Sequence, residues 1–513
     1  MLGVYLGLLF LVHLHTTASL NIYVSSSTGS DSNSGLTPAT PVSTLAHASS
    51  LLTPPTGSDG IYLLRGDTWE LTQAWFLTGM TGLEISSYGP TLQRPRLTRP
   101  QFPSSSRAGP TLTIDNSSSV HVEGVEIEGG ENGIAFTFDH ISGAGVSLFT
   151  DFVVKDCFFN GIHGLNYNAS SGSWWGSAIA FAARHAGVVV DGVNIQGNIV
   201  NGSDVFYSND VPYSGFTRAY VKNLNITGNG ITQCGYNVVF LDTTSFVAVS
   251  NNVFLGDTPS QLFVAGTTDI IMGTLNSSVS LTGNEFTKRG EYQPGGPDGC
   301  SIDFETNATG VTFHGNYISR SFGAGIMVFG HVDGSNVDLV ITNNTLLRNG
   351  CNQTRDDHGG IAFMRKASSG VLHGNIFSTC PGTPALNDKG DPGLPGWDLQ
   401  DNVQDGVAGA SVIAAGNPVL TSHALPSGGL HIDAATTSDA GGPPSTLTYT
   451  VDGSVPLRDS PPFPVGGMDL PAHWRTLVLF VKAWPTQQQG GVGAHTVLVE
   501  SESVGGVFAP PTP

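Results

Sequence analysis

The sequence predicts an all-β protein whose main part is a solenoid of about ten coils, preceded by a cap and followed by a small β-sandwich. Two observations predict the solenoid. A short phrase of alternating apolar residues recurs nine times between Val120 and Asn375, at intervals of 28 to 36 residues. Its central residue is Asn in five consecutive repeats, which predicts a ladder of stacked amides along the solenoid axis.

The repeated phrase consists of a strand, a small polar pair and a second strand, because its apolar residues alternate. Its nine centres are Val125, Cys157, Val193, Leu224, Asn252, Asn284, Asn316, Asn344 and Asn375. One weaker turn is expected at Asn402. Since no single repeat can bury its apolar face alone, the coils are expected to stack in register.

A further strand precedes the phrase in several coils. Five of these strands align on Ile179, Val238, Ile302, Ile326 and Ile361. Alternation then directs one column of side chains outward: Ala180, Val239, Asp303, Met327 and Ala362. The next outward column is Ala182, Leu241, Glu305, Phe329 and Met364. Two carboxylates, Asp303 and Glu305, thus stand among small or apolar neighbours.

The ends of the chain differ from the repeats. Residues 1–19 are expected to be a signal peptide, because their apolar run is too short to span a bilayer and small residues follow it. No later stretch reaches transmembrane length. The expected domains are a cap with the first strands (20–110), including a helix near Val42 to Leu52, the β-helix (111–405), a linker (406–428), a β-sandwich (429–505) and a tail (506–513).

Eight Asn-x-Ser/Thr sequences agree with secretion and predict N-glycosylation. They begin at Asn116, Asn168, Asn201, Asn225, Asn276, Asn307, Asn343 and Asn352. The five cysteines leave at least one unpaired and allow one or two disulfides between neighbouring coils. We therefore expect a secreted, extracellular and monomeric glycoprotein.

The net charge of −20 argues against nucleic acid or an anionic membrane surface as a partner. A polysaccharide stays open as a partner, even an acidic one, because a local basic or calcium site can override the global charge. Solubility alone is the simpler explanation of the charge.

Two segments resemble known families. The opening YVSSSTGSDSNSGLTPATPVSTL and the later YLLRGDTW and ISSYG resemble secreted right-handed parallel β-helix proteins of the pectate-lyase-like superfamily. This resemblance implies a right-handed parallel β-helix and secretion, and it leaves the reaction open. The order YTVDGSVP, SPPF and VKAW resembles the chitobiase-type β-sandwich, which implies an accessory module without catalytic residues.

Candidate catalytic residues gather in DGCSIDFETN and RDDHGGIAF. The set is Asp298, Asp303, Glu305, Arg355, Asp357 and His358. Asp303 and Glu305 share a strand face, roughly 6 to 7 Å apart. The alternative is that these two form a solvated strand face, that Asp298 and Asp357 belong to ordinary turns, and that His358 is satisfied by backbone.

Candidate substrate-binding residues are Trp175, Arg184, His185 and Phe329. Trp175 and its neighbour Trp174 are followed along the chain by an insertion containing Phe206 and Tyr207, and exposed aromatics in inserted loops favour sugar binding. The alternative is that the paired Trp residues pack their long loop onto the coil.

Two chemistries fit the carboxylates. A glycoside hydrolase uses one carboxyl as acid and another as base or nucleophile, and no cofactor is then expected. A uronate lyase would hold calcium with Asp298, Asp303 and Glu305, and Arg355 or Lys366 would be its base. The scarcity of Lys favours hydrolysis slightly. The absence of the polygalacturonase segments NTD and RIK leaves a non-catalytic glycan- or protein-binding glycoprotein as the rival hypothesis.

Overall fold

A computed structural model of the chain describes part of it in detail. The described residues are 19–52, 59–100, 109–139, 145–164, 176–209, 217–234, 238–241, 243–256, 270–272, 277–288, 299–304, 308–329, 336–351, 358–364, 368–405, 411–414, 418–425, 430–436, 445–451, 456, 460–470, 477–485, 496–499 and 504–508.

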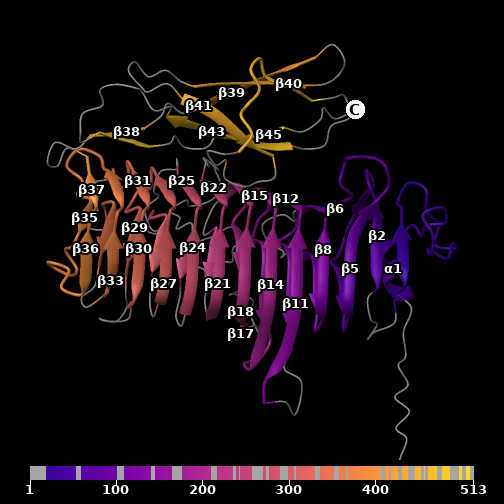
Figure 1. Cartoon of the computed structure of the whole chain (residues 1–513). Coiled ribbons are helices and arrows are strands. Elements are labelled where there is room, and N and C mark those ends of the chain that lie inside the picture. The colour runs from indigo at the N-terminus through magenta and orange to yellow at the C-terminus, as the bar shows by residue number, and fades with distance from the viewer. Residues whose placement is uncertain are drawn as a thin grey trace, which may run out of the picture.

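Three long parallel sheets form the solenoid, and the chain visits them in turn (Figure 1). Sheet A contains β1 (Asn21–Val24), β2 (Gly60–Leu64), β5 (Thr81–Tyr88), β8 (Ser118–Glu123), β11 (Ser147–Lys155), β14 (Val188–Gln196), β18 (Tyr220–Thr227), β21 (Thr244–Ser250), β24 (Ser277–Thr282), β27 (Thr309–His314), β30 (Leu339–Thr342), β33 (Gly370–His373) and β36 (Trp397–Gln400). Sheet B contains β3 (Thr68–Glu70), β6 (Arg96–Arg99), β9 (Glu126–Gly129), β12 (Phe158–Ile162), β15 (Ile199–Ser203), β19 (Gly230–Cys234), β22 (Val253–Gly256), β25 (Glu285–Lys288), β28 (Tyr317–Ser319), β31 (Thr345–Leu347), β34 (Ile376–Ser378) and β37 (Val403–Gln404).

Sheet C completes each coil. It contains β4 (Trp75–Thr78), β7 (Pro110–Asp115), β10 (Asn132–Phe138), β13 (Ser177–Ala183), β16 (Val205–Ser208), β20 (Val239–Leu241), β23 (Ile270–Met272), β26 (Ile302–Phe304), β29 (Ile326–Val328), β32 (Ile361–Phe363) and β35 (Leu386–Asn387), with β17 (Thr217–Arg218) antiparallel to β13. Apolar side chains from all three sheets fill one continuous core, in which aromatic rings of successive coils stack, as Phe136 does on Phe181. The predicted parallel β-helix is therefore confirmed.

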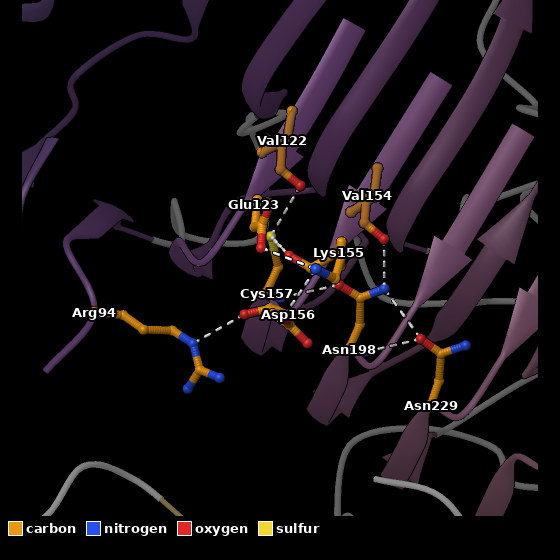
Figure 2. A network of polar contacts seen from close by, with 9 residues as sticks. All are labelled: Arg94, Val122, Glu123, Val154, Lys155, Asp156, Cys157, Asn198 and Asn229. Atoms are coloured by element: carbon orange, nitrogen blue, oxygen red, sulfur yellow. Dashed lines mark hydrogen bonds and ion pairs between the residues drawn. The ribbon is translucent and has the colours of Figure 1, made fainter. Parts of the chain in front are cut away.

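The Asn ladder lies at the corner between sheets A and B and is longer than the sequence suggested. It runs through Asn198, Asn229, Asn252, Asn284, Asn316, Asn344, Asn375 and Asn402. Each Oδ1 accepts the backbone N–H of the ladder residue in the preceding coil. Cys157 begins the row, because its backbone N–H donates to Asn198 Oδ1 at 3.0 Å (Figure 2). The turn expected at Asn402 is confirmed.

The centres expected at Val193 and Leu224 are wrong by five residues. Both lie inside strands of sheet A, where Val193 pairs with Phe152 and Leu224 with Val193. The cause is a left-handed kink inside the strand, at the same level in neighbouring strands. Gly192 has a φ of +77°, and Gly197, directly before Asn198, has a φ of +63°. The kink and the corner both place a residue suited to a left-handed conformation between apolar residues, so spacing alone could not separate them.

The N-terminal segment begins with strands that already pair into the three sheets, since β1 through β6 are members of them. The expected short helix is present as α1 (Leu45–Leu51), and its N-cap Thr44 accepts the backbone N–H of His47. The carboxylate of Asp31 accepts four hydrogen bonds from Ser43 and Thr44, at 2.7 to 2.9 Å. These bonds fix the opening loop against the start of the helix.

The C-terminal strands form two antiparallel sheets around one small core. One sheet contains β39 (Pro418–Ala424), β40 (Leu430–Thr436) and β42 (Met468–Leu470), and the other β41 (Ser445–Thr450), β43 (Leu477–Pro485) and β45 (Val504–Phe508). Ile432, Phe463 and Val481 are buried between them. A parallel pair, β38 (Ser411–Ala414) and β44 (Thr496–Val499), lies outside these two sheets. We call residues 411–508 the C-terminal module, and it lies along sheet B (Figure 1).

One disulfide joins Cys351 to Cys380, whose Cα atoms are 5.2 Å apart in neighbouring coils. Cys157, Cys234 and Cys300 are buried and form no disulfide. Burial raises the pKa of the Cys157 thiol to about 11, so this thiol is not a reactive nucleophile at neutral pH. Within the described ranges, no helix has the length and hydropathy needed to cross a bilayer.

Candidate functional site

The outer face of sheet C carries the described residues of the predicted site. Its central column consists of positions that are in register from strand to strand: Ala180, Ser208, Phe240, Ile271, Asp303, Met327, Ala362 and Asn387. The expected outward positions of Val239 and Leu241 are wrong, because both are fully buried in the solenoid core and Phe240 between them faces outward. Because Val238 and Val239 are adjacent, the sequence allowed either of them to align with Ile302. The pairing between strands places Val239, and not Val238, in the column of Ile302.

Asp303 is one of the two predicted catalytic residues that lie within the described ranges, and the other is His358. Asp303 lies at the centre of β26, with Ile302 and Phe304 in the core on either side. Its neighbour in the next strand is Met327, and both side chains are 2% exposed. The outward orientation expected from alternation is therefore present, and the carboxylate lies in a site almost closed to solvent.

Phe329 follows the strand next to that of Asp303, and His358 precedes the strand after that one. Phe329 follows β29, and its backbone N–H donates to Phe304 O at 2.9 Å. It is half-buried and precedes the half-buried Met364 in the same outward column. His358 lies at the corner that leads into β32, and its carbonyl accepts Asn387 Nδ2 at 2.8 Å. Asp298, Glu305, Arg355, Asp357 and Trp175 lie outside the described residues.

Arg184 and His185 form a charged cluster at the edge of the same sheet. Arg184 Nη1 lies 2.7 Å from Asp115 Oδ1 and 3.9 Å from Asp139 Oδ2, and His185 Nε2 lies 3.1 Å from Asp139 Oδ1. Thr137 Oγ1 donates to Asp115 Oδ1 at 2.6 Å. Asp115 is nearly buried, whereas the His185 side chain is 67% exposed. The cluster can therefore present imidazole and guanidinium donors whose orientation is fixed by two carboxylates.

The sequence prediction missed Asp115 and Asp139. The signal was present, because Asp115 ends a strand of alternating apolar residues, Leu112 and Ile114, and so points outward. The alignment of outward columns began only with Ile179, two strands later. Starting it one or two coils earlier would have placed Asp115 and Thr137 in the column of Ala182.

The two groups are separated along the sheet. Four strand steps lead from β13, which precedes Arg184, to β26, which holds Asp303. At the usual interstrand spacing this is about 19 Å. Sheet C thus has two polar sites on one face, Asp303 and the Arg184 cluster. Small, apolar and aromatic residues lie between them. An extended ligand could contact both.

The two ends of the segment predicted to carry stacking tryptophans are held together by one carboxylate. Asp204 Oδ2 accepts the backbone N–H of Gly164 at 2.7 Å and of Gly176 at 2.8 Å, and its Oδ1 lies 2.9 Å from His163 Nδ1. Gly164 and Gly176, the described residues on either side of 165–175, are therefore held together directly before β13. The expectation that Phe206 and Tyr207 add exposed aromatic surface here is wrong, because both are fully buried in the core.

The outer faces of the other two sheets differ from that of sheet C. Sheet A exposes polar side chains and small ion pairs, such as Lys222 with Asp191 at 2.8 Å. Sheet B carries buried apolar side chains on its outer face, including Phe158 and Val253, and lies under the C-terminal module. Neither face gathers the residues predicted for catalysis and binding.

Metal binding stays a prediction. No three His, Cys, Asp or Glu side chains in the described part of the chain gather as metal ligands would. Of the three calcium candidates only Asp303 is described, and one carboxylate does not make a calcium site, which needs six or more oxygens.

The predicted glycosylation sites occupy different environments. Asn343 is exposed, with a φ of +55°, at the corner between sheets A and B. The side-chain amides of Asn116, Asn201 and Asn225 donate to Asp115, Asn160 and Asn194, at 3.1 to 3.3 Å. Asn168, Asn276, Asn307 and Asn352 lie outside the described residues.

Comparison with known proteins bears on the fold. Residues 214–394 match the profile of a family described as "Right handed beta helix region". The fold is a right-handed parallel β-helix. A comparison with curated protein sequences finds no match.

The chain resembles the solved GH136 lacto-N-biosidase from Eubacterium ramulus, with a TM-score of 0.53 and 16% identity, over 75% of this chain and 67% of that one. It also matches an alginate lyase from Paenibacillus sp. str. FPU-7, with a TM-score of 0.34 and 12% identity over 70% and 97% of the two chains. An endo-xylogalacturonan hydrolase from Aspergillus tubingensis gives 0.33 and 11% over 72% and 91%. The first similarity supports the fold, and TM-scores as low as the other two carry no argument.

Proposed function

We propose that the protein is a secreted carbohydrate-active enzyme that binds a polysaccharide along the outer face of sheet C and cleaves a glycosidic bond there. One observation supports this most. Asp303 and Phe329, predicted for catalysis and binding, lie on that face together with the cluster around Arg184, although Asp115 of the cluster and Phe329 are 214 positions apart in the sequence. The separation of about 19 Å between the two polar sites suits a chain-like substrate better than a small molecule.

In the proposed reaction, Asp303 is the general acid. A general acid passes its proton directly to the leaving oxygen, and the nearly closed site of Asp303 keeps bulk water away from that transfer. Glu305, two residues further along the chain, is proposed as the base or nucleophile, with Asp298, Asp357, Arg355 and His358 as supporting groups. Phe329, Trp175, Arg184 and His185 are proposed to bind sugar. Hydrolysis is favoured over uronate elimination, and calcium would be needed only for the latter. The GH136 lacto-N-biosidase of the same fold makes neutral glycans the first substrates to test.

The test is to incubate the purified protein with neutral and with uronic-acid glycans. Two products are measured: new reducing ends, and unsaturated sugars that absorb in the ultraviolet. Reducing ends alone indicate hydrolysis, and unsaturated products indicate a lyase. Asp303→Asn and Glu305→Gln should each lower kcat by a factor on the order of 100 or more. The control is Asp191→Asn on sheet A. Full activity of both site variants would show that these residues are not catalytic.

The near-complete burial of Asp303 favours a second function, that of a non-catalytic glycoprotein that binds glycans or proteins. In that case Asp303 is a structural residue beneath the binding face. A glycan array would establish this second function if the protein binds a glycan without cleaving it. The binding should be lost in Arg184→Ala and kept in Asp303→Asn.

A further inference from the structure

A buried ion pair joins the C-terminal module to the solenoid. Lys482 Nζ in β43 lies 3.2 Å from Glu285 Oε2 in β25, and the two side chains are 2% and 0% exposed. The same ammonium group lies 4.6 Å from the ring centroid of Tyr317, the neighbour of Glu285 in the next strand. Thr287 Oγ1 donates to the other carboxylate oxygen of Glu285 at 3.4 Å. Two charges and a π face thus meet out of contact with water.

Each charged side chain points away from the core of its own unit. In β25, Phe286 is in the solenoid core, so alternation directs Glu285 outward. In β43, Leu479 and Val481 are in the module's core, so Lys482 points to the opposite face. Both groups are therefore buried where the two units meet, not within either one.

The surroundings of the pair are apolar. Val253 precedes Glu285 in the outward column of sheet B and is fully buried, and Tyr317, which follows it, is 4% exposed. Removing two charges from water into such surroundings is costly, and their mutual attraction repays this only when the geometry is correct. A shift of the module along the solenoid by one strand, about 4.8 Å, would move the Lys482 charge away from Glu285 and onto Val253 or Tyr317, the neighbours of Glu285 in sheet B. The pair therefore discriminates strongly against other docking positions.

We infer that the C-terminal module is a fixed brace of the β-helix, docked in one register on the outer face of sheet B, and not an accessory domain on a flexible tether. The partner of that face is this chain's own module, and Glu285 and Lys482 select the docked position. The docked module keeps ligands from the outer face of sheet B around β25, whereas Arg96 and Glu128 in β6 and β9 of the same sheet stay partly exposed. This inference does not depend on the proposed function.

The experiment uses the full chain and compares Glu285→Gln, Lys482→Met and the double variant carrying Glu285→Leu with Lys482→Met. Each single variant leaves one buried charge without its partner. We expect a larger radius of gyration in small-angle X-ray scattering, and protease cleavage between solenoid and module faster by a factor on the order of 100. The double variant, which buries two apolar groups instead, should recover the wild-type scattering and cleavage rate.

The matched control is Asp191→Asn, which breaks the exposed Lys222–Asp191 pair on sheet A and should change neither measurement. Wild-type scattering and cleavage in both single variants would overturn the inference. If a single variant loses its β-sheet circular dichroism, Tyr317 provides the second test. Tyr317→Leu should release the module and Tyr317→Phe, which keeps the ring, should not. Identical behaviour of these two would also overturn it.

Discussion

Asn284 donates two hydrogen bonds to one oxygen of Asn316, from its backbone N at 2.9 Å and from its Nδ2 at 3.0 Å. Asn284 Oδ1 receives the same pair of bonds from Asn252, so each amide is both donor and acceptor along the ladder. The Nδ2 of Asn284 also donates to Val249 O at 2.8 Å. Because the residue is 1% exposed, water cannot replace these partners.

Asn284→Ala should therefore be strongly destabilising. It leaves two buried donors of Asn252 and the carbonyl of Val249 without partners, and each unsatisfied group costs about 1 to 3 kcal/mol. We expect the free energy of unfolding in urea to fall by about 3 kcal/mol or more. The control, Asn225→Ala, removes one bond on the half-exposed face of sheet A and should cost less than about 1 kcal/mol. Equal losses would refute a special role for the ladder.

Cys157→Asn should extend the ladder by one position. The Sγ of Cys157 lies 3.7 Å from Val122 O, the place where later coils have an Asn Nδ2 donating to a carbonyl. An amide there would replace a weak S–H contact by a normal hydrogen bond, which contributes about 0.5 to 1.5 kcal/mol. Thermal unfolding should show a higher Tm for Cys157→Asn than for wild type, and a lower one for Cys157→Ala. A lower Tm for the Asn variant would show that the first corner lacks room for the amide.

The opening loop should weaken in acid through Asp31. Burial raises the pKa of this carboxyl group, but hydrogen bonds from Thr44 and Ser43 outweigh that effect and lower the pKa to about 2. A lowered pKa means that the stabilisation is complete above the unfolded value near 4 and is lost as the pH falls towards 2. Asp31→Asn should thus have a lower Tm than wild type at pH 5, and the difference should vanish near pH 2.

The control for this pH dependence is Asp338→Asn, an exposed carboxylate near the far end of sheet A. Its difference from wild type should stay small between pH 5 and pH 2. A difference between Asp31→Asn and wild type that does not change with pH would contradict the proposed linkage.

The Cys351–Cys380 disulfide should stabilise the last coils. It closes a separation of 29 residues, for which chain entropy predicts about 3 to 4 kcal/mol. The double variant Cys351→Ser with Cys380→Ser should unfold at correspondingly lower urea concentration. Thiol titration gives an independent check, because wild type should show three free thiols after denaturation and none in the native state. Five thiols in the denatured, unreduced protein would rule out the bond.

Among the described sequons, Asn343 should carry the glycan with the highest occupancy. A glycan replaces one hydrogen of Nδ2, which Asn116, Asn201 and Asn225 use in hydrogen bonds, whereas Asn343 is exposed at a corner. Peptide mapping of protein secreted from a glycosylating host should find Asn343 modified, and Asn343→Gln should remove one glycan mass. An empty Asn343 beside an occupied Asn225 would count against this reasoning.

The sequence predicted the solenoid because every coil repeats the same local physics. Alternating apolar residues form strands, and a left-handed residue followed by Asn forms the corner, so the positions of Asn252 to Asn375 were correct. The same logic failed at Val193 and Val238. Gly192 and Asn223 adopt left-handed conformations inside strands, and adjacent valines left two registers possible. Local signals of equal strength could be separated only by the pairing between strands.

The candidate site shows the same division between features set by local sequence and features set by the packing of coils. Alternation determined that Asp303 points away from the core, because Ile302 and Phe304 must be buried. Its near-complete burial, and the meeting of Asp115 and Asp139 with Arg184, depend on neighbours that stacking brings together from other coils. The burial of Glu285 against Lys482, 197 positions away, has no local signal at all. Periodicity is a property of a segment and can be read from the sequence, whereas desolvation and pairing belong to surfaces that exist only after the coils have stacked and the module has docked.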